Sequence, residues 1–120
     1  MSRVVLGLVD DLFFTAKIAA TASICAVSVS FVKNQEDLLK TARELKPSLI
    51  LIDLSKDSLS PVNAIRTLKG NSEVQAIPVI GFYSHVQTEL KEKAIQAGCN
   101  TVMPRSFFSQ NLASILSEGA

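Results

Sequence analysis

Three aspartates stand at the ends of predicted strands, where they could together hold a hard metal ion. Asp10 and Asp11 follow the apolar run 4–9, and Asp53 ends the run 49–53. The large aliphatic residues before Asp53 predict a strand buried on both faces, in the middle of a parallel sheet. In open α/β sheets, ligands bind where the strands deliver their carboxyl ends. If the two strands are neighbours, three carboxylates converge there, and a divalent ion with oxygen ligands would relieve their mutual repulsion.

The rest of the sequence alternates strands with helices, which would place these acids in an α/β fold. Strands are predicted at 4–9, 26–32, 49–53, 77–83 and 101–103. Helices are predicted at 12–23, from the cap Asn34 to the stop at Pro47, from Ser60-Pro61 to Gly70, across Val86, Leu90 and Ala94 to Gly98, and from about Ser109 onward. Strands and helices in this order imply a parallel sheet with helices on both faces.

Composition and charge exclude several classes of function. The chain has 120 residues, of which 48% are hydrophobic and 19% charged, so we expect one folded domain over 1–120. A net charge of +1 with both signs interspersed gives no electrostatic case for nucleic acid or a membrane surface. No apolar run approaches the roughly 20 residues of a membrane span, and residues 1–3 do not begin a signal peptide. Cys25 and Cys99 match no metal or redox spacing, so we expect a cytoplasmic protein with reduced thiols.

The chain resembles the receiver domain of bacterial two-component response regulators over its whole length. Four short motifs and one interval carry the resemblance: Leu8-Val9-Asp10-Asp11, Leu51-Ile52-Asp53, Ile77-Pro78-Val79-Ile80, Ala97-Gly98-Cys99, and the distance from Asp53 to Arg105. Each motif is weak alone, but their order and spacing are specific. The resemblance implies a flavodoxin-like, doubly wound sheet of five parallel strands in the order 2-1-3-4-5, with five helices.

The resemblance also implies a phosphorelay reaction that depends on Mg²⁺. It makes Asp53 the phosphoacceptor and assigns the metal to Asp10, Asp11, Asp53 and the backbone carbonyl of Ser55. A bound divalent ion polarises the phosphoryl group, and Asp53 can then attack it and form an aspartyl phosphate. The competing interpretation is that these acids are only solvated or cap helices. The register of Asp53 on the predicted central strand favours the metal site.

Several positions depart from the family pattern and make this an atypical receiver. Arg105 and Ser106 stand where the family has lysine and proline; arginine keeps the charge and can fork two phosphate oxygens, but it is planar and longer. Tyr83 replaces the family's switch threonine or serine, and Val102 replaces its partner aromatic. Ser84 is adjacent, but neighbours on a strand face opposite ways, so it could serve only through a bulge or a one-residue slip.

Two features near this edge of the sheet stay open. His85, the single histidine, is either a cap or surface residue or a group that orients or blocks water at the phosphoryl site. The aromatic residues nearby either belong to the core or form an apolar rim suited to a partner protein: Phe13, Phe14, Tyr83, Phe107 and Phe108.

We expect a response regulator that accepts a phosphoryl group from a histidine kinase or phosphotransfer protein and is not itself an enzyme. Its output would pass to a downstream protein target or through a homodimer. The alternative is a pseudo-receiver, a phosphorylation-independent interaction module, which the substitutions at 83, 102, 105 and 106 favour.

Two other functions of related chemistry fit the sequence poorly. A flavodoxin-like nucleotide or FMN binder needs a Gly/Ser/Thr cradle where this chain has Asp10-Asp11. A phosphatase of the aspartate type needs an Asp-x-Asp pair where it has Asp53-Leu54-Ser55.

Overall fold

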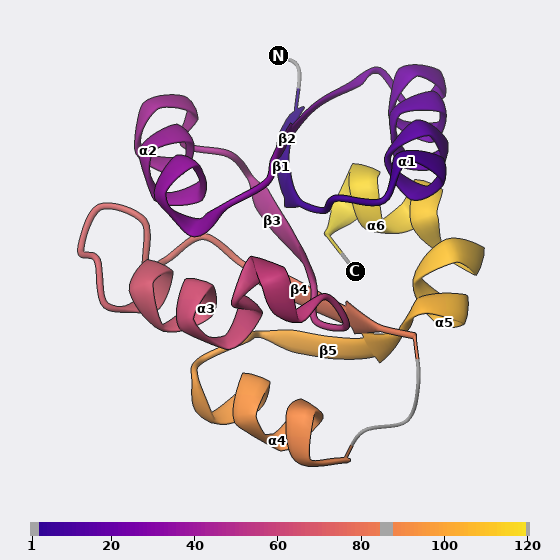
Figure 1. Ribbon diagram of the computed structural model, residues 1–120. Coiled ribbons are helices and arrows are strands. Elements are labelled where there is room, and N and C mark those ends of the chain that lie inside the picture. The colour runs from indigo at the N-terminus through magenta and orange to yellow at the C-terminus, as the bar shows by residue number, and fades with distance from the viewer. Residues whose placement is uncertain (1–2, 85–87, 120) are drawn as a thin grey trace.

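The strands of this chain form one parallel sheet in the order β2-β1-β3-β4-β5 (Figure 1). The computed structural model describes residues 3–84 and 88–119. The strands are β1 Arg3–Leu8, β2 Val27–Val32, β3 Leu49–Asp53, β4 Val79–Tyr83 and β5 Thr101–Pro104. The parallel α/β fold and the strand order that the resemblance implied are therefore confirmed.

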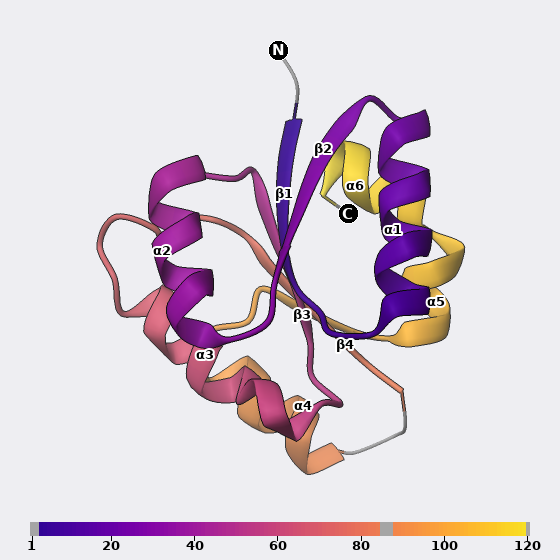
Figure 2. The ribbon, with the colours of Figure 1, turned by 45° about the horizontal axis from the view of Figure 1, so that its top comes forward.

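The helices cover both faces of this sheet (Figures 1 and 2). One face carries α1 Leu12–Ile24, α5 Arg105–Gln110 and α6 Leu112–Glu118; the other carries α2 Gln35–Leu45, α3 Pro61–Lys69 and α4 Thr88–Gln96. A 3₁₀ turn, η1, spans Asp57–Leu59. None of the helices in the described ranges has both the length and the apolar character needed to cross a membrane.

The C-terminal helix differs from its prediction. The helical segment begins at Arg105 rather than near Ser109, and Asn111 divides it into α5 and α6, so the described residues hold six α-helices instead of five. Asn111 leaves helical geometry at φ −112° and ψ 19°, and its side-chain amide donates a hydrogen bond to the Phe107 carbonyl at 2.9 Å. Such side-chain bonds compete with the helical ladder and explain the break.

The two helix starts predicted from capping residues have different outcomes. The Asn34 side chain accepts the Asp37 N–H at 2.8 Å, which confirms the cap of α2. Ser60 makes no side-chain cap for α3: it lies at φ 47°, and its N–H closes η1 on Asp57. The role of Ser60 as a side-chain cap was therefore predicted wrongly, because the preceding turn fixes its backbone.

The core consists of two apolar clusters, one on each face of the sheet. β3 supplies both, because successive side chains point to opposite faces: Leu49 and Leu51 join one cluster, and Ile50 and Ile52 join the other. This confirms the prediction of a strand buried on both faces. The first cluster centres on three aromatic rings, with Phe82 stacked on Phe108 at 4.6 Å and tilted against Phe14 at 5.1 Å.

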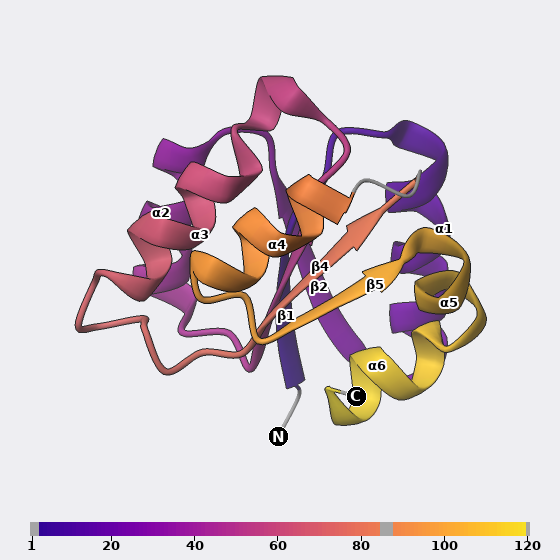
Figure 3. The same ribbon diagram turned by 90° about the horizontal axis from the view of Figure 1, so that it is seen from below.

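The amino ends of the strands lie opposite the carboxyl ends that position the aspartates. Figure 3 shows the arrowheads of β4 and β5 pointing away from the N- and C-terminal ends of the chain. At that far side, the Arg3 Nε donates a hydrogen bond to the Leu116 carbonyl at 2.7 Å. This bond ties the first strand to the last helix.

Candidate functional site

The carboxyl ends of β1 and β3 bring the three aspartates to one open pocket of about 450 Å³. The two strands are hydrogen-bonded neighbours, with Leu8 opposite Ile52, so the residues that follow them meet at the same edge. The pocket is lined by three predicted metal ligands, a serine that was predicted to supply a carbonyl, and residues of the next loops: Asp10, Asp11, Asp53, Ser55, Lys56, Asp57, Ser58, Ser84 and Arg105.

Asp53 is the buried acid of this pocket, with 5% of its surface exposed. Its Oδ1 accepts the Ser55 N–H at 3.0 Å. Burial raises the pKa of Asp53 above its usual value, and the nearby Asp11 charge acts in the same direction. The Ser55 N–H, Arg105 and Lys56 oppose this rise without cancelling it.

The raised pKa makes ionised Asp53 a cost to the fold, so we expect Asp53→Asn to be more stable than the wild type at neutral pH. Asparagine keeps the acceptor for the Ser55 N–H but carries no charge. The native state holds the Asp53 proton more tightly than the unfolded chain, so the wild type loses stability as the pH rises through the raised pKa. A gain of about 1 kcal/mol, or about 4 °C in Tm, is expected at pH 7.5.

The gain should shrink toward zero as the pH falls below the ordinary aspartate pKa, which thermal unfolding monitored by circular dichroism from pH 7.5 to pH 3.5 would measure. Asp57→Asn, at an exposed acid of the same pocket, is the matched control and should show a smaller change. A destabilised Asp53→Asn at pH 7.5 would contradict the expectation.

Arg105 is held across the pocket against α1. Its Nη2 donates to the Asp11 Oδ2 at 2.9 Å, and its Cζ lies 4.0 Å from the centroid of the Phe14 ring, within the range of a cation–π contact. The other oxygen of Asp11, Oδ1, caps α1 by accepting the Phe14 N–H at 3.1 Å. The hydrogen bond from Arg105, followed by the bond from the Phe14 N–H, lowers the pKa of Asp11.

Lysines neutralise Asp10 in a similar way. The Lys56 Nζ donates to the Asp10 carbonyl at 3.2 Å and lies 3.6 Å from its Oδ2, while the Lys33 Nζ lies 3.9 Å from its Oδ1. Lys56 was not singled out from the sequence. A lysine in a polar loop gives no periodic signal, and its position depends on η1, which the buried Leu59 anchors.

The donor atoms of the pocket fit a divalent cation in kind, since carboxylate and carbonyl oxygens are the ligands that Mg²⁺ takes in proteins. Their present arrangement does not hold one. Within residues 3–84 and 88–119, no group of three acidic, histidine or cysteine side chains is disposed to bind a metal. The Asp11 carboxylate is instead paired with Arg105, and the Asp10 carboxylate lies near Lys56.

Ser84 and Tyr83 lie in different surroundings. Ser84 lines the pocket, and its backbone N–H donates to the Ser55 Oγ at 2.7 Å. Tyr83, the last residue of β4, packs against the apolar cluster on the α2–α4 face together with Val102, and it is not among the described residues that line the pocket. His85, for which two interpretations were open, lies outside the described residues.

The aromatic residues near this edge divide between core and surface. Phe14 and Phe108 are buried in the aromatic cluster. Phe13 is 91% exposed and Phe107 is 50% exposed. Phe13 lies two residues after Asp11, and Phe107 lies two residues after Arg105, the partner of Asp11. Leu12, next to Asp11, is 81% exposed. These three exposed side chains, Leu12, Phe13 and Phe107, are the candidates for the apolar rim.

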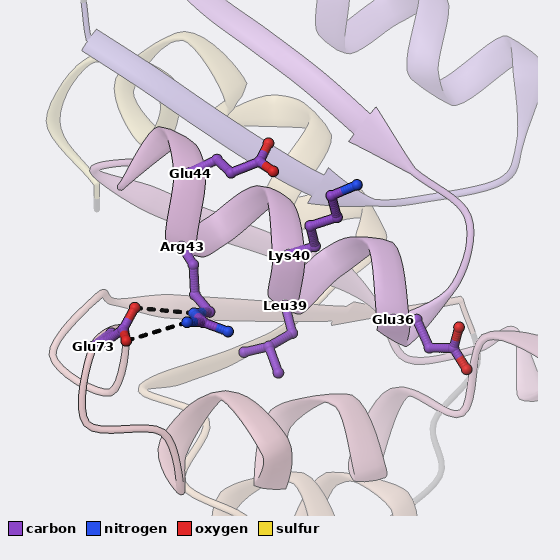
Figure 4. Close-up of a pocket in the computed structure, with 6 residues that line it drawn as sticks. All are labelled: Glu36, Leu39, Lys40, Arg43, Glu44 and Glu73. Carbon is purple, nitrogen blue, oxygen red and sulfur yellow. Dashed lines mark hydrogen bonds and ion pairs between the residues drawn. The ribbon is translucent and has the colours of Figure 1, made fainter.

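A larger pocket of about 640 Å³ lies along α2 and holds none of the predicted site residues. Figure 4 shows its charged lining, in which the Arg43 guanidinium faces the Glu73 carboxylate from the opposite wall. The Arg43 Nε donates to the Glu73 Oε2 at 2.9 Å. The rest of its described lining is Leu39 and the charged side chains of Glu36, Lys40 and Glu44.

Comparison with known proteins agrees with this architecture. No protein-family model matches the chain. The chain is 30% identical over 73 residues to the polar-differentiation response regulator DivK of Brucella anthropi, a match that covers 61% of this chain and 59% of DivK.

Solved structures of response regulators match the fold over the full length. The magnesium-bound receiver domain of the sensor histidine kinase PA1611 from Pseudomonas aeruginosa superposes with a TM-score of 0.84 at 20% identity and full coverage of both chains. The chemotaxis response regulator CheY4 of Vibrio cholerae gives 0.85 at 14% identity, also with full coverage of both. The phosphorylated phytochrome response regulator RcpA of a cyanobacterium gives 0.83 at 14% identity and covers all of this chain and 97% of RcpA. The chain thus has the receiver fold of the response regulators.

Proposed function

We propose that this chain is a receiver that accepts a phosphoryl group on Asp53 in a reaction dependent on Mg²⁺ and then signals to a protein partner. The observation that carries the proposal is the position of Asp53: a buried carboxylate at the end of the central strand, with two further acids and Arg105 around the same pocket. Magnesium, when bound by Asp10, Asp11, Asp53 and the Ser55 carbonyl, neutralises and polarises the phosphoryl oxygens.

The residues of the pocket divide the chemistry among them. The Ser55 N–H holds the Asp53 Oδ1, so the other carboxylate oxygen is the nucleophile that attacks phosphorus. The bond from phosphorus to the donor's histidine nitrogen breaks, and the histidine leaves. Arg105 and Lys56 supply positive charge to the transferred oxygens, and Ser84, which follows the position of the family's switch residue and lines the pocket, supplies a hydroxyl.

The donor in this proposal is a cytoplasmic histidine kinase or phosphotransfer protein, and the chain acts as an acceptor without turnover of its own. The exposed candidate rim of Leu12, Phe13 and Phe107 suits contact with such a protein. A downstream protein target, or a second copy of the chain, would then receive the signal.

The proposal predicts that Mg²⁺ with beryllofluoride, a mimic of the phosphoryl group, binds at Asp53 of the folded protein. Backbone amide signals of residues 53–56 and 84 should shift in ¹⁵N-correlated NMR spectra, because Asp53, Ser55, Lys56 and Ser84 line the pocket that the mimic occupies. Asp53→Asn should abolish the shifts, and Asp57→Asn should keep them. A folded wild type that shows no shifts at millimolar Mg²⁺ would exclude phosphorylation.

The pseudo-receiver is the second candidate, and two observations favour it. Asp11 is engaged by Arg105, and Tyr83 packs into the apolar cluster instead of the pocket. In that case the rim would bind its partner whether or not Asp53 is modified, and Asp53→Asn would leave partner binding unchanged.

A further inference from the structure

Arg105 occupies the carboxylate of Asp11, a side chain that the proposed metal site also uses. One carboxylate oxygen, Oδ1, is used by the Phe14 N–H at the start of α1, and the other, Oδ2, accepts the Arg105 Nη2 at 2.9 Å. Both oxygens are therefore engaged before any metal arrives. Each oxygen keeps a second lone pair, but a metal ion bound to Oδ2 would lie beside the positively charged guanidinium, so electrostatic repulsion favours displacement of the arginine.

The arginine is fixed from a second side. Its guanidinium carbon lies 4.0 Å from the Phe14 ring centroid, and that ring is itself held in the core by Phe82 and Phe108. The planar guanidinium can lie on an aromatic face while it donates to a carboxylate, and a lysine ammonium cannot reproduce both contacts.

We propose that Arg105 acts as an internal cation that competes with divalent metal for Asp11, so that the pocket takes up metal only when the Arg105–Asp11 pair opens. Arg105 is thereby a positioning residue that sets the metal affinity of this chain. The proposal concerns the same pocket as the proposed function and rests on it for its biological meaning. Metal binding alone, without any phosphoryl mimic, is nevertheless enough to test it.

The test is a titration of the full chain with Mg²⁺ at constant ionic strength, followed by isothermal calorimetry and by amide NMR. Arg105→Ala should bind Mg²⁺ about tenfold more tightly than the wild type, which corresponds to the loss of one competing charge-assisted hydrogen bond. Arg105→Lys keeps the charge without the ring contact and should fall between the two. Equal or weaker binding by Arg105→Ala, or no binding by any form, would overturn the competition.

Two control variants separate direct competition from general charge. Arg43→Ala removes another arginine–carboxylate pair, in the pocket along α2, and should leave Mg²⁺ affinity unchanged. Arg105→Lys that binds as weakly as the wild type would show that charge alone sets the affinity, which contradicts the proposal. A direct readout is the Arg105 side-chain Nε–H signal of the wild type: it should shift as Mg²⁺ saturates the protein, and a signal that stays in place contradicts displacement.

The experiments distinguish a failure of the proposed metal competition from a failure of the proposed phosphoacceptor function. If Arg105→Ala binds Mg²⁺ more tightly but the wild type gives no beryllofluoride response, the competition stands and the phosphoacceptor function fails. If the wild type responds to beryllofluoride while Arg105→Ala shows no gain in affinity, the function stands and the competition fails.

Discussion

Replacing Phe82 by alanine is expected to lower the free energy of unfolding by about 3–5 kcal/mol, the usual cost of removing a large aromatic side chain from a core. Phe82 is fully buried, stacks on Phe108 with ring centroids 4.6 Å apart, and contacts Phe14. The cavity would lie directly beneath the site, since Phe82 is opposite Asp53 in the pairing of β3 with β4. Urea unfolding monitored by circular dichroism would measure the loss.

The matched control is an exposed phenylalanine. Phe13 is 91% exposed, so Phe13→Ala should change stability by no more than about 0.5 kcal/mol. A domain of this kind is usually stable by about 5–15 kcal/mol, so Phe82→Ala would remove a substantial part of its stability. A loss below 1 kcal/mol for Phe82→Ala would contradict the central place of the aromatic cluster.

Gly81→Ala is the second substitution with a large expected effect. Overpacking of the core should lower the free energy of unfolding by about 1–3 kcal/mol. A Cβ at Gly81 would lie 2.8 Å from the Leu54 Cδ1 and 3.0 Å from its Cγ. Leu54 is fully buried, so its side chain cannot turn out into solvent. It also follows Asp53, and its N–H donates to the Phe82 carbonyl at 2.8 Å, so a displaced Leu54 would move the acid as well.

Gly7→Ala provides the comparison for this substitution. A Cβ at Gly7 would lie 2.9 Å from the Phe31 Cδ1, nearly as close as the contact expected at Gly81. Phe31 is only partly buried, however, so its ring can turn aside. Unfolding measurements should therefore rank Gly81→Ala as more destabilising than Gly7→Ala, and only Gly81→Ala should shift the amide signal of Ser55. The reverse order would show that Leu54 can be repacked.

The fold was predictable because its signals are local and repeated. The aliphatic run before Asp53 is long enough to require burial on both faces, and the alternation in β2 marks a half-exposed edge strand, as the pairing of β2 with β1 alone bears out. The convergence of the aspartates at one pocket follows from parallel strands, whose carboxyl ends share an edge. These inferences do not depend on which side chains contact one another.

The arrangement within the pocket was not predictable, because it depends on contacts between side chains that are distant in the sequence. The Arg105–Asp11 pair joins residues far apart in sequence, and which acid an arginine contacts depends on side-chain reach and on the Phe14 ring beneath it. Ser84 was expected to need a bulge or a one-residue slip in order to face the pocket. It lies beyond the end of β4, where the alternation of a strand no longer applies, and it lines the pocket.

The hydrogen bond from Arg3 to the Leu116 carbonyl has a practical consequence for handling the protein. It holds the start of β1 and the helix α6 at the side of the sheet opposite Asp53, so a fluorescent label attached to the exposed end of α6 would lie away from the reactive edge. The closeness of Arg3 and Leu116 suits a circular permutant, in which a linker connects β1 to α6 and the chain is opened in an exposed loop. A circular permutant of this kind would keep the acids in place while presenting a different part of the chain for fusion.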